Sequence, residues 1–110
     1  MIVSVIVLFG VALTCIVIGC QNRKGNISML HSYHRARVAE EDVLPFGKMV
    51  GNGMLIVGAS IAVYGGAMLL SSLWQLPHAV TVGTAVMSIG LVVGLGLTFY
   101  AMKKYNKGIF

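Results

Sequence analysis

The sequence predicts an all-α integral membrane protein with three transmembrane helices and a cytoplasmic loop that carries a short interfacial helix. Of its 110 residues, 57% are hydrophobic and only 10% are charged, whereas a soluble domain is typically about 25% charged. The apolar residues form three long runs without a charge, and every lysine and arginine lies in residues 23–48 or 103–107. A water-soluble globule of this length would expose large apolar patches, so the pattern favours lipid as the solvent.

The first predicted span covers residues 2–20. Residues 2–19 form a run of 18 without a charge, which reaches about 27 Å as a helix and is just long enough to cross a bilayer. A signal peptide would carry a basic residue before this run, and none is present. The stretch that ends at Cys20 resembles a lipoprotein cleavage box, but Arg23 and Lys24 follow at once and favour a span. Cys15 and Cys20 are interpreted as small packing residues.

The first connection, residues 21–47, is the only long polar segment. Met29, Leu30 and Tyr33 fall near one face of a short helix, which would suit the headgroup level of a membrane. His31 and His34 have the spacing of a metal pair, but the neighbouring arginines disfavour a bound cation, and we predict no metal site and no cofactor. Nine residues are expected to contact lipid headgroups or a partner: Arg23, Lys24, His31, Tyr33, His34, Arg35, Arg37, Glu40 and Glu41.

The second and third predicted spans cover residues 48–74 and 79–102, and neither contains a charge after Lys48 at the start of the second. Pro45 is expected at the first position of the second helix, where its missing N–H costs nothing. Three acidic residues precede it and suit the positive end of the helix dipole. Trp74 marks a membrane interface, residues 75–78 form a tight connection, and residues 103–110 form a tail.

The distribution of basic residues predicts the orientation of the chain. The first connection, together with Lys48 directly after it, carries five lysines and arginines, the second connection none and the tail three. The positive-inside rule therefore places the first connection and the C-terminus in the cytoplasm and the N-terminus outside. We expect a multi-pass protein of the cell (cytoplasmic) membrane. The net charge of +5 is not a nucleic-acid signal here, because the basic residues flank the spans.

Small residues recur four apart in the second and third spans, so that they share a helix face. Such faces let two helices approach closely in lipid. They predict either packing of the second span against the third within one molecule, or an interface with another copy or another membrane protein. The residues concerned are Gly47, Gly51, Gly58, Ala62 and Gly66 in the second helix, and Gly90, Gly94 and Thr98 in the third.

A family resemblance rests on the order of features around the first connection. Tyr33 lies in a basic loop, Glu40 and Glu41 form an acidic pair, and residues 46–51 (FGKMVG) open the next helix. This order resembles small bacterial three-helix membrane proteins, which in turn resemble the SdpI-type immunity and signalling membrane family. The resemblance covers about a third of the chain. It implies a bacterial cytoplasmic membrane, three helices and a loop that contacts a partner.

Apart from Lys48 at the first position of the second span, the spans contain no Asp, Glu, Lys, Arg or His, whereas ion-coupled transporters usually place such a residue at membrane depth. The sequence therefore favours a non-enzymatic protein that acts through helix–helix and loop interactions, in immunity or stress regulation. A holin-like or pore-forming oligomer is the alternative, and a small transporter subunit is a weaker one. Lipid and a membrane protein, either a second copy or another chain, are the expected partners.

Overall fold

The computed structural model describes residues 2–27 and 38–108, and over these residues the protein is helical and contains no strand. Three long helices, α1 (Ile2–Arg23), α3 (Val43–Trp74) and α4 (Ala79–Tyr105), are accompanied by a short 3-10 helix, η1 (Glu40–Asp42). Each long helix is long and apolar enough to cross a membrane. The predicted all-α fold with three such helices is therefore confirmed. The predicted interfacial helix around Met29, Leu30 and Tyr33 lies outside the described residues.

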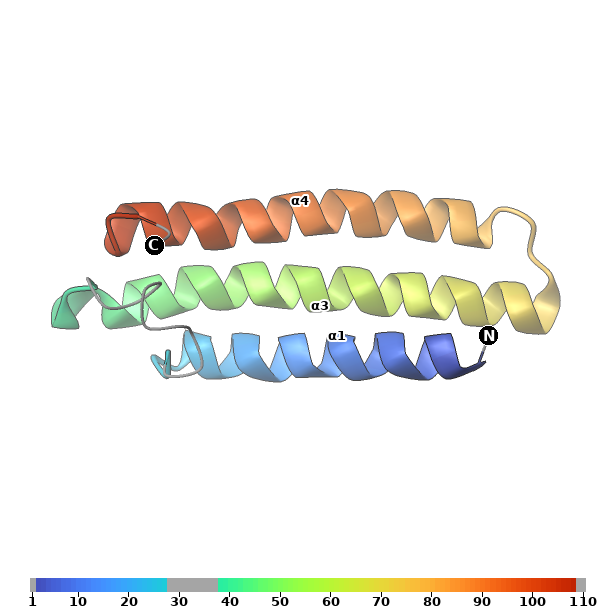
Figure 1. Ribbon diagram of the computed structural model, residues 1–110, viewed down its shortest axis with the longest axis horizontal. Helices are drawn as coiled ribbons and strands as arrows, with labels where there is room; N and C mark the ends of the chain where they lie inside the picture. Colours follow the sequence, from blue (N-terminus) through green and yellow to red (C-terminus); the bar gives the residue numbers. More distant parts are fainter. Residues whose placement is uncertain (1, 28–37, 109–110) are drawn as a thin grey trace.

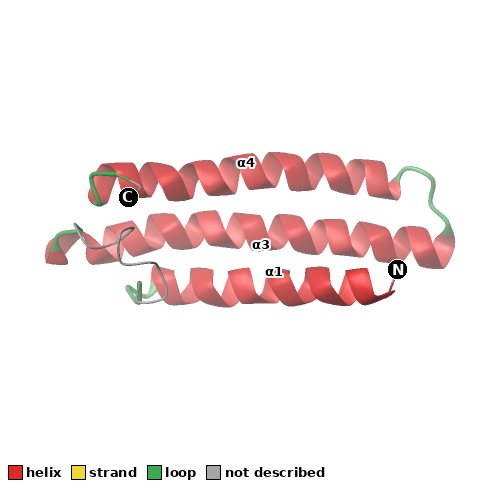
Figure 2. Cartoon of the chain, in the orientation of Figure 1, coloured by secondary structure: helices red, strands yellow, loops and turns green. Residues whose placement is uncertain are grey.

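The three helices lie side by side, with α3 between α1 and α4 (Figures 1 and 2). Each helix runs antiparallel to its neighbour, so the first residues of α1 and the α3–α4 turn lie at one end (Figure 1). The last residues of α1 and α4 lie at the other end with the start of α3. The molecule is elongated, with extents of 51 × 20 × 19 Å, and α1 and α4 make few contacts with each other.

The helices extend past the predicted spans at the end that carries the basic residues. α1 continues to Arg23 instead of residue 20, α4 continues to Tyr105 instead of residue 102, and α3 begins at Val43 instead of residue 48. A helix satisfies its own backbone hydrogen bonds, so it can continue beyond its most apolar part without cost. Pro45 consequently lies at the third residue of α3, still within the first turn, where its missing N–H removes no helical hydrogen bond.

A short reversal joins α3 to α4. Gln75 adopts the left-handed conformation (φ 52°, ψ 42°) and its N–H donates to the Ser71 carbonyl, which ends α3. The N–H of Ala79 donates to the Leu76 carbonyl at 3.4 Å, and α4 begins there. Because this turn is so short, α4 must return along α3, and the two helices are forced into an antiparallel pair.

The largest apolar cluster lies where α3 begins and α4 ends. Phe46, Val50 and Ala101 are fully buried there, with Met102 almost so. The Tyr105 ring meets Phe46 edge-on, with 6.2 Å between ring centroids. Along the rest of the helices most large apolar side chains point outward. An outward-facing apolar surface of this extent is what lipid, and not water, solvates.

Candidate functional site: the small-residue helix interfaces

The interface between α1 and α3 is built from small residues seven positions apart. Gly51, Gly58 and Gly65 line the α3 side and are buried. A Cβ atom added to Gly51 would lie 2.5 Å from the Gly19 carbonyl oxygen, and one added to Gly58 would lie 3.0 Å from the Ala12 carbonyl oxygen. The first distance is shorter than real Cβ atoms show, and the Cβ added to Gly58 would also lie only 2.8 Å from the Ile16 Cγ1 atom. The backbones of α1 and α3 therefore approach so closely that only glycine fits at these positions.

The interface between α3 and α4 repeats this design on another side of α3. A Cβ on Gly53 would lie 2.6 Å from the Gly94 carbonyl oxygen, and a Cβ on Gly94 would lie 2.7 Å from the Gly53 carbonyl oxygen. Farther along, a Cβ on Gly90 would collide with the Ser60 hydroxyl, and one on Gly83 would lie 2.6 Å from the Ala67 Cβ. Close approach thus continues over most of the length of α4.

Hydroxyl groups in and beside these interfaces are satisfied within their own helices. The Ser60 hydroxyl donates to the Ile56 carbonyl at 2.7 Å, and the Thr98 hydroxyl donates to the Gly94 carbonyl at 2.9 Å. Thr14 and Thr84 make the same bond one turn back, to Gly10 and Val80. Hydroxyl groups bonded in this way can be buried between helices or face lipid, since they need no water.

The predicted packing residues divide between the two interfaces. Gly90, Gly94 and Thr98 face α3, as expected for packing of the second span against the third. Gly47, Gly51 and Gly58 differ from the expectation, because they meet α1 and not α4. Gly51 and Gly53 are two residues apart and thus about 200° apart around the helix, so α1 and α4 lie on nearly opposite sides of α3.

Two predicted packing residues are not placed in either interface by close contacts. Ala62 is half-buried. Gly66 is different from every other predicted glycine, because no atom lies within 4 Å of the position that its Cβ would occupy. Gly66 is therefore not required for packing within one molecule.

The predicted packing residues are small residues four apart, whereas the interfaces of the structure consist of small residues seven apart. Seven-residue spacing keeps two helices in contact along a left-handed packing, which most membrane bundles adopt. Sets of three small residues seven apart, such as Gly51, Gly58 and Gly65, can be found in the sequence with that spacing. The interface residues missed for this reason are Ala12, Gly19, Gly53, Ser60, Gly65, Ala67 and Gly83.

The predicted loop residues fall into two groups. Arg23 and Lys24 are exposed at the end of α1, where they line a surface hollow of about 320 Å³ with Cys20. Glu40 and Glu41 are exposed in η1, immediately before α3. The remaining five, His31, Tyr33, His34, Arg35 and Arg37, lie outside the described residues.

Asn22 is an unexpected feature of the α1–α3 interface. Its side chain is fully buried, and among the described residues neither its amide nitrogen nor its amide oxygen has a hydrogen-bond partner. Its backbone carbonyl lies against Gly47, where a Cβ would collide with it. Asn106 is equally buried, but its amide donates to the Gly108 carbonyl at 3.0 Å.

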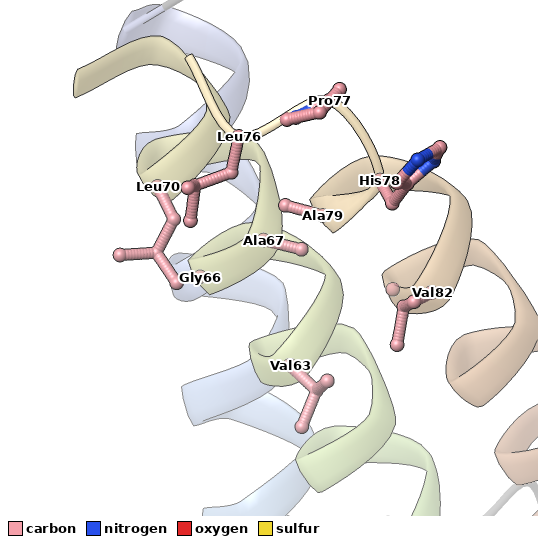
Figure 3. A pocket seen from close by; sticks show the side chains of 10 residues that line it. Val63, Gly66, Ala67, Leu70, Leu76, Pro77, His78, Ala79 and Val82 are labelled. Atoms are coloured by element: carbon pink, nitrogen blue, oxygen red, sulfur yellow. The ribbon is translucent and has the colours of Figure 1, made fainter. Parts of the chain in front are cut away.

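A second surface hollow, of about 600 Å³, lies between α3 and α4 near their connecting turn (Figure 3). Val63, Leu70 and Val82 contribute apolar side chains to its wall, and Gly66 and Gly83 give it depth because they have none. The His78 ring points away from the interior of the hollow (Figure 3). The hollow between α3 and α4 is thus lined mainly by apolar residues.

Comparison of this chain with models of known protein families, with curated proteins and with solved structures finds no match.

Proposed function

We propose that this chain is a non-enzymatic multi-pass protein of the cytoplasmic membrane that acts through contacts of its helices and its polar loop with other membrane components. The observation that carries the proposal is that small and large apolar residues lie on different parts of the helices. Small residues join the helices, and most large apolar side chains along them point outward. The outward surface is therefore available to lipid and to membrane partners.

The ends of the helices support one orientation in the membrane. Arg23 and Lys24 at the end of α1, Lys48 near the start of α3, and Lys103 and Lys104 at the end of α4 all lie at the same end of the molecule. The positive-inside rule assigns this end to the cytoplasm. The N-terminus and the turn at His78 would then face outward, and the C-terminus inward.

Within this proposal, the polar loop provides the contact with a partner, in an immunity or stress-regulatory role. The resemblance of the region around Glu40, Glu41 and Gly47 to the SdpI-type family supports this version. The exposed position of Glu40, Glu41, Arg23 and Lys24 also leaves their charges accessible. Lipid headgroups carry phosphate, which suits the basic members of this set.

Controlled expression separates this function from that of a holin-like or pore-forming oligomer. We expect expressing cells to keep their growth rate and membrane potential, because a protein that acts through contacts opens no path for ions. The measurement is a potential-sensitive dye, with an unrelated three-helix membrane protein expressed to the same level as control. Collapse of the potential in the test strain alone would replace the proposal with a pore. Accumulation or loss of a specific solute, at normal potential, would instead indicate the transporter alternative.

A further inference from the structure

The end of the molecule at which α1 and α4 end carries more positive charge than the chain itself can neutralise. The chain has eight lysines and arginines and only three acidic residues, which gives a net charge of +5. Pairing of every acid with a base would therefore still leave five positive charges. The molecule is 20 × 19 Å across, so neighbouring basic side chains at this end are close enough to repel one another.

The acidic residues lie at a different depth from the basic residues that are nearest the apolar spans. Glu40, Glu41 and Asp42 form η1, and Asp42, the last of them, precedes Lys48 by more than one helical turn. The acids thus lie about 9 Å or more farther from the middle of α3 than Lys48. Within residues 2–27 and 38–108 no lysine or arginine forms an ion pair with them. The level next to the apolar spans is therefore basic.

Arg23 and Lys48 belong to different helices and lie at the same level. A Cβ on Gly51 would overlap the Arg23 Cγ atom, and a Cβ on Gly47 would overlap the Asn22 carbonyl oxygen. Lys48 stands between these two glycines and shares a side of α3 with Gly51, three residues later. The two like charges are consequently neighbours, and an anion between them would remove their repulsion.

A surface hollow and an unbonded amide complete this basic level. The hollow of about 320 Å³ is lined by Cys20, Arg23 and Lys24. Asn52 is exposed and lies four residues after Lys48, so the two share a face of α3. Among the described residues the Asn52 amide forms no hydrogen bond. Two helices therefore present three cations and a neutral N–H donor at one level.

We propose that Arg23, Lys24, Lys48 and Asn52 bind the phosphate group of an anionic phospholipid of the cytoplasmic leaflet. The inference rests on the proposed function, because the orientation proposed there places this end of the molecule in that leaflet. The guanidinium group offers a planar pair of N–H donors to phosphate oxygens, and the lysines add positive charge. The Asn52 amide donates one further hydrogen bond.

The charge at this level favours an anionic lipid over a zwitterionic one. The ammonium group of a zwitterionic headgroup would add positive charge to a level that has a surplus of it, and the acids of η1 lie farther out. Basic clusters between helices at the cytoplasmic side are typical sites for anionic headgroups.

The surroundings of the site favour a lipid over a free phosphate ion. Toward the middle of the helices, the exposed residues Val17 on α1 and Ala59 on α3 continue the surface as an apolar one. α1 and α4 make few contacts with each other, which leaves this side of α3 accessible to an acyl chain. The acyl chains of a lipid hold its phosphate at this depth, whereas a free ion would have to leave water to reach it.

Binding of lipid to the purified chain tests the proposal. The protein in detergent is mixed with equal amounts of phosphatidylglycerol and phosphatidylcholine that carry the same acyl chains, and the bound lipid is measured by native mass spectrometry. We expect preferential retention of phosphatidylglycerol. Equal retention of the two lipids would overturn the proposal. Excess glycerol phosphate should not displace the bound lipid, and displacement would show that a soluble phosphate is the ligand instead.

Single substitutions locate the site. Lys48→Gln is expected to raise the dissociation constant for phosphatidylglycerol about fivefold, the value for one basic side chain at an anionic surface. Asn52→Ala should raise it about threefold to tenfold, because a hydrogen bond to a charged group is lost without a change in charge. Lys103→Gln is the matched control. It removes the same charge at the same end, but Lys103 lies nine residues after Gly94, which faces α3, and so points away from α3.

The control decides between a site and general attraction to charge. Equal weakening by Lys103→Gln and Lys48→Gln, or unchanged binding in Asn52→Ala, would refute the site. All three residues are exposed, so the unfolding temperature of each variant should match that of the wild type, and Lys24→Gln replaces any variant that does not meet this condition.

The same measurement separates the site from the proposed function, because binding in detergent does not depend on orientation in the cell. Absence of lipid preference in a chain that inserts as proposed would refute the site alone. Preference for phosphatidylglycerol in a chain that inserts with the His78 turn inside would leave the headgroup contacts intact, but it would refute the proposed orientation and the assignment to the cytoplasmic leaflet.

Discussion

Asn22 and Asn106 show that the surroundings of a buried asparagine decide whether its amide is hydrogen-bonded. Both side chains are fully buried near the end of the molecule that carries the basic residues. The Asn106 amide donates a hydrogen bond to the Gly108 carbonyl, whereas both polar atoms of Asn22 lack a partner within residues 2–27 and 38–108. A buried polar group without a partner loses its hydration and gains nothing in return. The two residues should therefore respond oppositely to an apolar replacement.

We expect Asn22→Leu to raise the free energy of unfolding by about 1–2 kcal/mol, because it removes an unpaired buried amide. Asn106→Leu should lower it by about 1 kcal/mol, because a hydrogen bond is lost. Thermal unfolding in the same detergent, followed by circular dichroism, measures both. A loss of stability in Asn22→Leu equal to that of Asn106→Leu would show that the Asn22 amide does have a partner.

At the scale of the element, α3 organises the fold. Gly51 and Gly58 on one side and Gly53 on the other bring the backbones of both neighbours close. Packing, and not the hydrophobic effect, drives helix association in lipid, since lipid tails are as apolar as the side chains. The glycines of α3 are for this reason the main stabilising residues of the three-helix arrangement.

Glycine substitutions in α3 should separate the inner interfaces from the free face. Gly58→Leu is expected to destabilise the protein by about 1–3 kcal/mol or more, because its side chain would overlap Ile16 and the Ala12 carbonyl. Gly66→Leu should leave the stability of the single molecule within about 0.5 kcal/mol, since the site is open. Unfolding at dilute protein in excess detergent measures both. Equal losses would mean that Gly66 also lies in an inner interface.

At the scale of the whole molecule, the antiparallel order of the helices brings all flanking charges to one end. The short turn after Gln75 contains no charge, whereas the ends of α1 and α4 and the start of α3 carry basic residues. The apolar lengths between them match a bilayer. Charge asymmetry and helix order therefore lead to the same proposed orientation.

Labelling of single cysteines in intact cells tests this orientation. In a background without Cys15 and Cys20, we expect His78→Cys to react with a membrane-impermeant maleimide, and Lys104→Cys to react only after the cells are opened. The reason is that the proposed orientation places the turn outside the cell and the basic end in the cytoplasm. Labelling of Lys104→Cys in unbroken cells would reverse the assignment.

The number of helices, their approximate limits and the end at which the charges gather follow from the order of amino acids alone. These properties depend on composition along the chain: long uncharged runs, a short turn and flanking basic residues can be read without knowing any contact. The exact ends of the helices were less certain, because a helix such as α3 can continue beyond its apolar run while its backbone bonds remain satisfied.

Which small residues contact another helix became clear from the packing of the three helices. Gly51 and Gly66 look alike in the sequence, yet one lies against the Gly19 carbonyl and the other has no neighbour. The difference arises from the side of α3 on which α1 and α4 are placed, and in a helix whose glycines lie on several sides no periodicity specifies that choice. It is fixed by the mutual fit of backbones over seven-residue repeats, which is a property of pairs of helices and not of either helix alone.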